Sequence, residues 1–223
     1  MANESILRRR SLWPSHGGFT LVELLIVIAL IAILVAILLP VVNGLRSKAG
    51  QVKCMSNMRQ IGQGIVGYIY EHNQSLPGPT YSVMVAEYSY VPGEQLSRIQ
   101  QQSLFAFLGP YLKLPGGGWK VATPYLCPGW VKETLNPRSV IYYCLDIEID
   151  GTRTPPFGEW KDAVQPLKIS QIPKPSSTPA IIEMDQKNYP DRLTLPKRPV
   201  HQKGRNVLFF DWHMEFVPLP AGQ

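Results

Sequence analysis

Three side chains in the C-terminal half could do nucleophilic chemistry if the fold brought them together. Cys144, His201 and Asp211 are the residue types of a cysteine hydrolase, in which a histidine activates the thiol. Their spacing carries no information on proximity, and Cys144 lies inside the apolar run VIYYCLDIEI, as a packed or disulfide-bonded cysteine would. We therefore predict no catalytic residues and no enzyme activity. His201 and Asp211 are instead expected to hydrogen-bond a loop to a hairpin.

Acidic residues at alternate positions raise the question of a metal site. Asp146, Glu148 and Asp150, followed by Gly151, imitate the start of a calcium-binding loop. Such a loop needs an acidic residue at its twelfth position, where this sequence has Phe157. Alternation along a strand explains the same carboxylates as a solvated face. We predict no metal and no cofactor, with calcium at these three carboxylates as the alternative.

Tryptophan and basic residues could serve binding. Four tryptophans in the second half could stack on glycans or bases, although packing in a core or at turns is their more frequent role: Trp119, Trp130, Trp160 and Trp212. The net charge is +6, and half of it comes from Arg8, Arg9 and Arg10. The other Lys and Arg residues are dispersed, which indicates a solvated surface, and we predict no nucleic-acid partner.

The composition limits the class of protein. The 223 residues are 45% hydrophobic and 17% charged, and they include 21 Pro and 18 Gly. Aromatic and aliphatic residues are too many for a disordered chain, and no Gly-X-Y period indicates collagen. The sequence therefore predicts a folded, loop-rich protein.

One segment is long and apolar enough to span a membrane. In FTLVELLIVIALIAILVAILL (19–39) only Thr20 and Glu23 are not apolar. A helix of this length is about 31 Å long, close to the roughly 30 Å hydrocarbon core of a bilayer. The rest of the chain is too small to enclose such a helix easily. We predict a transmembrane helix over 19–39.

Residues on either side of this segment predict its orientation. Arg8, Arg9 and Arg10 precede it, and positive residues hold that flank in the cytoplasm, so the C-terminal part lies on the outer side. A cleaved secretory signal would have a shorter apolar core, followed by small residues. Here Pro40 and two valines follow the run, so we expect a single-pass anchor of the inner membrane.

The junction between leader and apolar run is similar to that of a known family. The residues GFTLVE (18–23) and the long apolar helix resemble the N-terminus of type IV prepilins and type II secretion pseudopilins. The resemblance implies that a prepilin peptidase cuts between Gly18 and Phe19 and methylates Phe19. It also implies a helix kink at Pro40. Removal of residues 1–18, with three Arg and one Glu, would lower the net charge to +4.

Glu23 is the one ionisable residue of the apolar segment. A carboxylate in a lipid-exposed helix costs about 2.5 kcal/mol or more near the bilayer centre, so it is expected to have a function and a partner. The resemblance implies that this partner is the N-terminal amine of a neighbouring subunit and that Glu23 serves assembly. The alternative is that Glu23 reaches water at the interface.

A helical pattern continues beyond Pro40 to about His72. One apolar stripe is spaced alternately by three and four residues: Cys54, Met58, Ile61, Ile65, Tyr68 and His72. We expect this amphipathic continuation (40–73) to pack against a globular head. Five glycines, at up to about 1 kcal/mol each, predict a bent or locally melted helix: Gly44, Gly50, Gly62, Gly64 and Gly67.

The head (74–223) is predicted to be a small antiparallel β-sheet covered by the helix, an α+β fold. The expected strands are 140–149, 180–184 and 206–210, with 213–217 returning antiparallel to the last of them. The predicted organisation is therefore a leader (1–18), a transmembrane helix (19–39), the amphipathic continuation (40–73) and the head (74–223).

Two further segments are similar to a group of pseudopilin-like proteins of planctomycete and verrucomicrobial bacteria. One is KCMSNMRQIGQGIVGYIYEHNQSLPGP (53–79), and the other is a histidine, nine residues and Asp-Gly, represented here by His201 and Asp211. Trp212 stands where that group has glycine, whose positive φ a tryptophan adopts only at a cost. The nine-residue spacing between His201 and Asp211 is intact. Cys127-Pro128, which lies between the two segments, also matches the group.

Three cysteines outside the cytoplasm permit one disulfide and one remaining thiol. The resemblance favours Cys54–Cys127, because both match recurrent positions, and this bond would fasten the helix to the head. Cys127–Cys144 is the local alternative, and spacing does not choose between them.

These observations predict a structural subunit of a type IV pilus-like or type II secretion-like filament. Its expected partners are a prepilin peptidase, other pilin-like subunits, the inner-membrane assembly machinery and membrane lipid. The alternative is a permanently anchored outer-face protein with a tryptophan-rich head that binds polysaccharide.

Overall fold

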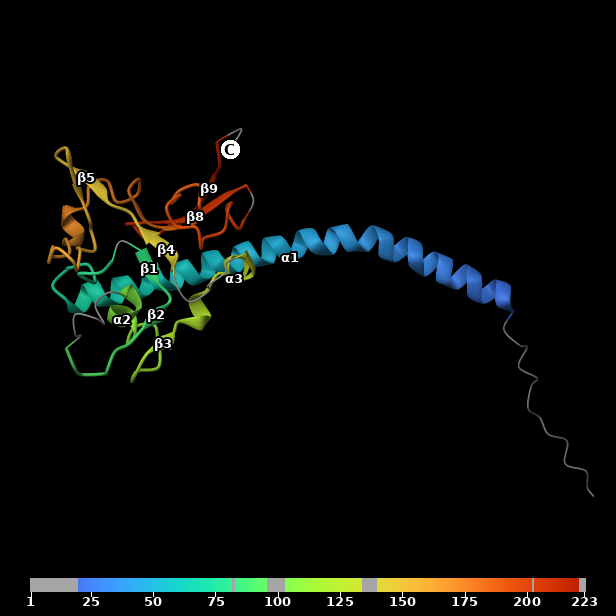
Figure 1. Cartoon of the computed structure of the whole chain (residues 1–223), viewed down its shortest axis with the longest axis horizontal. Coiled ribbons are helices and arrows are strands. Elements are labelled where there is room, and N and C mark those ends of the chain that lie inside the picture. Colours follow the sequence, from blue (N-terminus) through green and yellow to red (C-terminus); the bar gives the residue numbers. More distant parts are fainter. Residues whose placement is uncertain (1–19, 82, 96–102, 134–139, 202, 221–223) are drawn as a thin grey trace, which may run out of the picture. The chain divides into compact units, whose positions relative to one another are not determined.

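The computed structural model describes residues 20–81, 83–95, 103–133, 140–201 and 203–220. The chain divides into two compact units, Met1–Gly44 and Leu45–Gln223. Helix α1 (Leu21–Glu71) begins in the first unit and ends in the second (Figure 1). The fold is α+β, as predicted, with a long N-terminal helix and small antiparallel sheets.

In the first unit, α1 presents apolar side chains to its surroundings on every side. All fifteen large aliphatic residues between Leu21 and Leu39 are exposed, from 43% for Val27 to 86% for Leu21. Leu, Ile and Ala are compatible with a helix, and Pro40 lies inside α1. A soluble core helix would have buried such a surface, so this segment requires lipid or protein around it.

In the second unit, α1 buries one face. The fully or nearly fully buried apolar residues repeat every three or four positions: Cys54, Met58, Ile61, Ile65 and Ile69. The predicted stripe is correct as far as Ile65 and wrong at its end. Ile69 is buried, whereas Tyr68 is half-buried and His72 is exposed with its ring stacked on Tyr68. Positive φ angles at Asn73 and Gln74 then end the helix.

Three of the five glycines of α1, namely Gly62, Gly64 and Gly67, are contact points with the head rather than sites of melting. The helix is continuous through all five, so the expectation of a locally melted segment is wrong. A Cβ atom on Gly64 would lie 2.8 Å from Leu112 Cδ2, and one on Gly67 would lie 2.8 Å from Tyr111 Cδ1. The close packing of α1 against the head therefore depends on the absence of a side chain at Gly64 and at Gly67.

The head contains a five-stranded antiparallel sheet in the order β1-β4-β7-β8-β9. These strands are β1 (Val83–Val85), β4 (Val140–Cys144), β7 (Pro179–Glu183), β8 (Gly204–Phe209) and β9 (Met214–Pro218). Strands β8 and β9 form the predicted antiparallel hairpin, with Leu208 opposite Met214. The helix meets this sheet where Gly62 lies against Leu208 of β8.

The predicted strand 140–149 is two strands, and this correction has a local cause. The backbone leaves the large sheet after Cys144, and β5 (Ile147–Ile149) then pairs with β6 (Thr152–Thr154) in a separate hairpin. Asp150 and Gly151 both have positive φ (50° and 76°), the conformation of a two-residue hairpin turn. A run of β-branched and aromatic residues signals extended backbone without showing where it changes sheet.

Short elements complete the head. Strands β2 (Glu87–Tyr88) and β3 (Lys120–Val121) form another two-stranded sheet. The head also contains two short helices, α2 (Leu104–Leu108) and α3 (Pro128–Glu133), and two single turns of 3₁₀ helix, η2 (Thr123–Tyr125) and η3 (Ile169–Gln171). One hydrophobic core unites the buried face of α1 with the sheet and α2, and its largest fully buried side chains include Trp130, Tyr88, Tyr142 and Phe105.

Candidate functional site

The first turn of α1 is closed by a reciprocal pair of side chains. The Thr20 backbone N–H and hydroxyl donate to Glu23 Oε2 at 2.9 and 2.8 Å, and the Glu23 backbone N–H donates to Thr20 Oγ1 at 3.2 Å. This is a capping box, in which a threonine N-cap and a glutamate three residues later satisfy free N–H groups of the helix end. The carboxylate of Glu23 therefore lies at the helix N-terminus, where negative charge is favourable.

Several predicted positions precede this turn. Gly18 and Phe19, together with the arginines of the leader, lie outside the described residues. Of the helices that are described, α1 is long and apolar enough to cross a bilayer. Thr20 and Glu23 both follow the predicted cleavage position, so cleavage there would leave both partners of the cap on the chain.

The head holds two of its three cysteines in a disulfide. Cys54 of α1 is bonded to Cys127, which immediately precedes α3, and their Cα atoms are 4.9 Å apart. Both are buried. This bond joins the helix to a loop 73 residues further along the chain. Asn57, one turn after Cys54, adds a second link by donating from Nδ2 to the Leu126 carbonyl at 3.0 Å.

His201 lies beside this disulfide. Its Nε2 atom is 3.5 Å from Cys127 Sγ and 3.1 Å from Glu183 Oε1. The side chains of His201 and Glu183 are only 3% and 5% exposed. Glu183, at the end of β7, also accepts from the backbone N–H and the Nδ2 of Asn206 at 2.8 and 3.0 Å. Buried charge is costly unless paired and hydrogen-bonded, and these contacts satisfy that requirement.

The hydrolase constellation considered from the sequence has other partners in the structure. His201 contacts Glu183 and Cys127, whereas Asp211 pairs with His213 two residues later, through the His213 backbone N–H and Nδ1. Cys144 is a buried free thiol in β4. Burial, with a smaller contribution from the charge of Asp146, raises the pKa of Cys144 to about 12. A neutral buried thiol is a packing residue and a poor nucleophile.

Asp211 and Trp212 form the turn between β8 and β9. Desolvation raises the pKa of Asp211, but hydrogen bonds from the side chain and backbone of His213 lower it by a larger amount. The pKa therefore lies below its usual value. Trp212 has a φ of 70°, the conformation that glycine adopts without strain. Its indole packs edge-on against Phe210, with ring centroids 6.2 Å apart.

The acidic residues considered for calcium have structural roles. Asp146 forms an ion pair with Arg153 of β6 at 3.0 Å. Glu148 is exposed and lies opposite Arg153 in the β5–β6 register, and Asp150 forms the turn of the same hairpin. The hairpin accounts for the alternation of these carboxylates.

The four tryptophans considered for glycan binding lie in different environments. Trp130 is in the core at 1% exposure, and Trp119 is 58% exposed. Trp160 packs edge-on against Tyr81, with ring centroids 4.9 Å apart, and Trp212 belongs to the β8–β9 turn. Their individual packing gives no common stacking platform.

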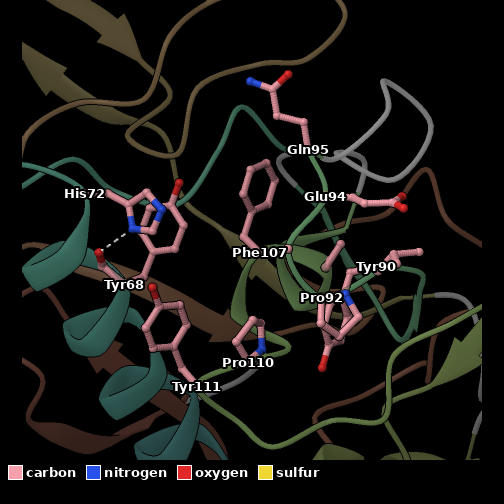
Figure 2. Close-up of a pocket in the computed structure, with 12 residues that line it drawn as sticks. Tyr68, His72, Tyr90, Pro92, Glu94, Gln95, Phe107, Pro110 and Tyr111 are labelled. Atoms are coloured by element: carbon pink, nitrogen blue, oxygen red, sulfur yellow. Dashed lines mark hydrogen bonds between the residues drawn. The ribbon is translucent and has the colours of Figure 1, made fainter.

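A groove of about 510 Å³ has other aromatic residues among those that line it (Figure 2). Tyr68 and His72 stack with ring centroids 3.7 Å apart, and Phe107 approaches Tyr68 edge-on at 6.1 Å. Tyr111 donates from its hydroxyl to Glu71 at 2.6 Å; burial and this bond raise its pKa. Glu94, on the opposite rim, gives the groove a polar edge (Figure 2).

Sequence reasoning missed two of these arrangements. The capping box was readable as T-x-x-E at residues 20–23, directly before an apolar run. The contacts of His201 with Glu183 and with Cys127 were not readable, because they depend on the pairing of β7 with β8 and on the docking of α1. Only the fold brings residues 54, 127, 183 and 201 together.

Comparison with known proteins identifies one motif. Residues 13–39 match the family model of the prokaryotic N-terminal methylation motif. No curated protein and no solved structure matches the chain. Proteins with this motif are structural subunits rather than enzymes, and the motif implies processing by a prepilin peptidase and assembly with pilin-like subunits. Together with the single long apolar helix, it fits a membrane-anchored protein and supports a type IV prepilin-like identity.

Proposed function

We propose that this protein is a structural subunit of a type II secretion-like or type IV pilus-like filament. The observation that carries this proposal is the exposed apolar half of α1, which coincides with the match to the methylation motif. A surface of this kind is stable in a bilayer before assembly and in a bundle of like helices afterwards. The head, closed around its own core, is carried by this helix.

Processing is the first step. A prepilin peptidase cuts between Gly18 and Phe19 and methylates the new amine of Phe19. The arginines before the cut hold the N-terminus in the cytoplasm, and the head lies on the outer side of the inner membrane. An extracytoplasmic position agrees with a disulfide between Cys54 and Cys127, because such bonds persist in oxidising compartments.

Glu23 serves assembly in this proposal. Its carboxylate lies at the N-terminus of α1, and in the sequence Glu23 is four residues after Phe19, whose amine cleavage would free. In a filament it pairs with the amine of a neighbouring subunit, which compensates both charges away from water. Pro40 provides a kink in the helix, and residues 40–73 connect it to the head (74–223).

The proposal is tested by producing the full chain in bacterial membranes with and without a prepilin peptidase. We expect the peptidase to shorten the protein by 18 residues, a shift visible on a gel. The Gly18→Val variant should keep its full length, because a larger side chain stands at the cut. Equal lengths with and without the peptidase would instead support the permanently anchored protein with a glycan-binding head.

A further inference from the structure

Four buried side chains with metal-ligating atoms converge at one point in the head. The donor atoms of Cys54, Cys127, Glu183 and His201 all lie within 4.8 Å of one another. All four residues are at most 8% exposed. Two sulfurs, one imidazole nitrogen and one carboxylate oxygen are ligand types that Zn²⁺ binds in proteins.

Two of the donor distances are close to those of a tetrahedral site. With zinc about 2.3 Å from sulfur and about 2.1 Å from nitrogen, these two donors are about 3.6 Å apart in a tetrahedral site. Cys127 Sγ and His201 Nε2 are 3.5 Å apart. Nitrogen and oxygen donors of such a site are about 3.4 Å apart, and His201 Nε2 and Glu183 Oε1 are separated by 3.1 Å. The two sulfurs, bonded to each other in the oxidised head, would have to separate to about 3.8 Å after reduction to complete the geometry.

The orientation of the imidazole favours coordination over proton relay. In a catalytic relay, one ring nitrogen of histidine faces the nucleophile and the other faces the carboxylate. Here both Cys127 Sγ and Glu183 Oε1 face the same atom, His201 Nε2. Donors grouped on one side of one nitrogen surround a common point, as ligands of a single ion do.

The surroundings of Glu183 resemble the support of a metal ligand. Asn206 donates to both carboxylate oxygens of Glu183, from its backbone N–H and from Nδ2. Hydrogen bonds of this kind orient ligating carboxylates in metal sites. The neighbouring Arg205 binds Asp185 through two bonds of 2.6 and 2.9 Å, so its charge is already engaged. A divalent cation would compensate the buried carboxylate directly.

We propose that the reduced form of this head binds one Zn²⁺ ion through Cys54, Cys127, His201 and Glu183. A dithiol or phosphine reductant supplies two electrons and, with two protons, converts the disulfide into two thiols while it is itself oxidised. Zn²⁺ then displaces the two thiol protons and binds both sulfurs. Disulfide and zinc site exclude each other, because each uses both sulfurs. Four protein ligands leave no open position, so this is a structural site. It is independent of the proposed filament function.

The test uses the full chain in detergent micelles, reduced with a phosphine and freed of reductant without oxygen, and titrated with Co²⁺ as a spectroscopic substitute for zinc. We expect saturation at one equivalent, a thiolate-to-cobalt charge-transfer band and the intense visible bands of tetrahedral cobalt. Zn²⁺ should abolish both. The oxidised chain should show no charge-transfer band.

Variants identify the ligands. His201→Ala and Glu183→Gln should each weaken Co²⁺ binding by at least about tenfold. Cys144→Ala is the matched control, because this cysteine is buried outside the cluster, and its binding should equal that of the wild type. Circular dichroism reports folding of each variant, and the comparison of reduced with oxidised wild type needs no substitution. The proposal would be overturned if the reduced wild-type chain showed no charge-transfer band with Co²⁺. This holds whether the chain is folded or unfolded after Zn²⁺ or Co²⁺ is added.

Discussion

Thr20 and Glu23 cap the first turn of α1 reciprocally, with three hydrogen bonds of 2.8 to 3.2 Å between them. Glu23 thus has a local structural role as well as the proposed role in assembly. The two roles need different properties of the side chain. Capping needs an acceptor oxygen, which glutamine also has, whereas pairing with an amine needs the negative charge.

Glu23→Gln separates these roles. We expect the variant to be cleaved normally and to lose filament assembly, because the cap is kept and the charge is removed. Glu23→Leu removes both and should lose assembly as well. The measurement is the amount of filament sheared from cells, compared with the amount of processed subunit in the membrane. Normal filaments from Glu23→Gln would assign this residue to capping alone.

Substitutions at two glycines of α1 should have opposite effects on stability. A Cβ on Gly50 meets nothing within 4 Å, so Gly50→Ala should stabilise the helix by about 0.5–1 kcal/mol. A Cβ on Gly64 would lie 2.8 Å from Leu112, so Gly64→Val should destabilise the head by about 1–3 kcal/mol through overpacking. Thermal unfolding of the monomer in detergent measures both.

Gly50→Val is the control for the change of side chain itself. It should leave stability nearly unchanged, because valine has a helix propensity similar to or slightly better than that of glycine. Equal destabilisation by Gly50→Val and Gly64→Val would contradict the close approach of α1 to the head at Gly64.

The sequence was most informative where a pattern is local. The apolar run, the buried face of α1 up to Ile65 and the β8–β9 hairpin follow from residue type and period. At the end of that face Ile69 is buried instead of Tyr68. This difference depends on where the helix stops and on which side chains the head can enclose. The split of 140–149 depends on strand pairing, which residue preference does not specify.

The candidate sites show the same division. The methylation motif and the capping box lie within a few consecutive residues and can be read directly. The partners of His201 cannot, because Glu183 is 18 positions away and Cys127 is 74 positions away. The spacing of His201 and Asp211 suggested a shared role, yet each has its own partner because they lie at opposite ends of β8.

Cys144 should be inert in the folded protein. Burial raises its pKa to about 12, so the thiol stays neutral from pH 7 to well above pH 9, and the side chain is only 3% exposed. An alkylating reagent at pH 8 should modify no cysteine of the oxidised chain until denaturant is added, and then one. Fast labelling of Cys144 without denaturant would show that the thiol is accessible.

The charge of Asp211 should contribute to stability above about pH 4 and lose this contribution at lower pH. Its pKa is lower in the folded chain than the usual 3.8, because hydrogen bonds from His213 outweigh the effect of partial burial. A lowered carboxyl pKa stabilises the fold above 3.8, and this contribution disappears as the pH falls through the folded-state value. The Asp211→Asn variant should therefore be less stable than the wild type at pH 5 to 6.

The difference between wild type and Asp211→Asn should shrink below about pH 4. Chemical unfolding at a series of pH values measures it, and His213→Ala should reproduce the effect because it removes the same bond. A difference that stays constant down to pH 2 would show that the aspartate acts through its shape rather than its charge.

The identity of the N-terminal residue tests the central claim most directly. Mass spectrometry of the N-terminal peptide, from protein made in cells that contain a prepilin peptidase, distinguishes the two fates of the chain. The proposed filament subunit should begin at Phe19 and carry one methyl group on its amine. A chain that still begins at Met1 or Ala2 would contradict the account and leave α1 as a permanent anchor.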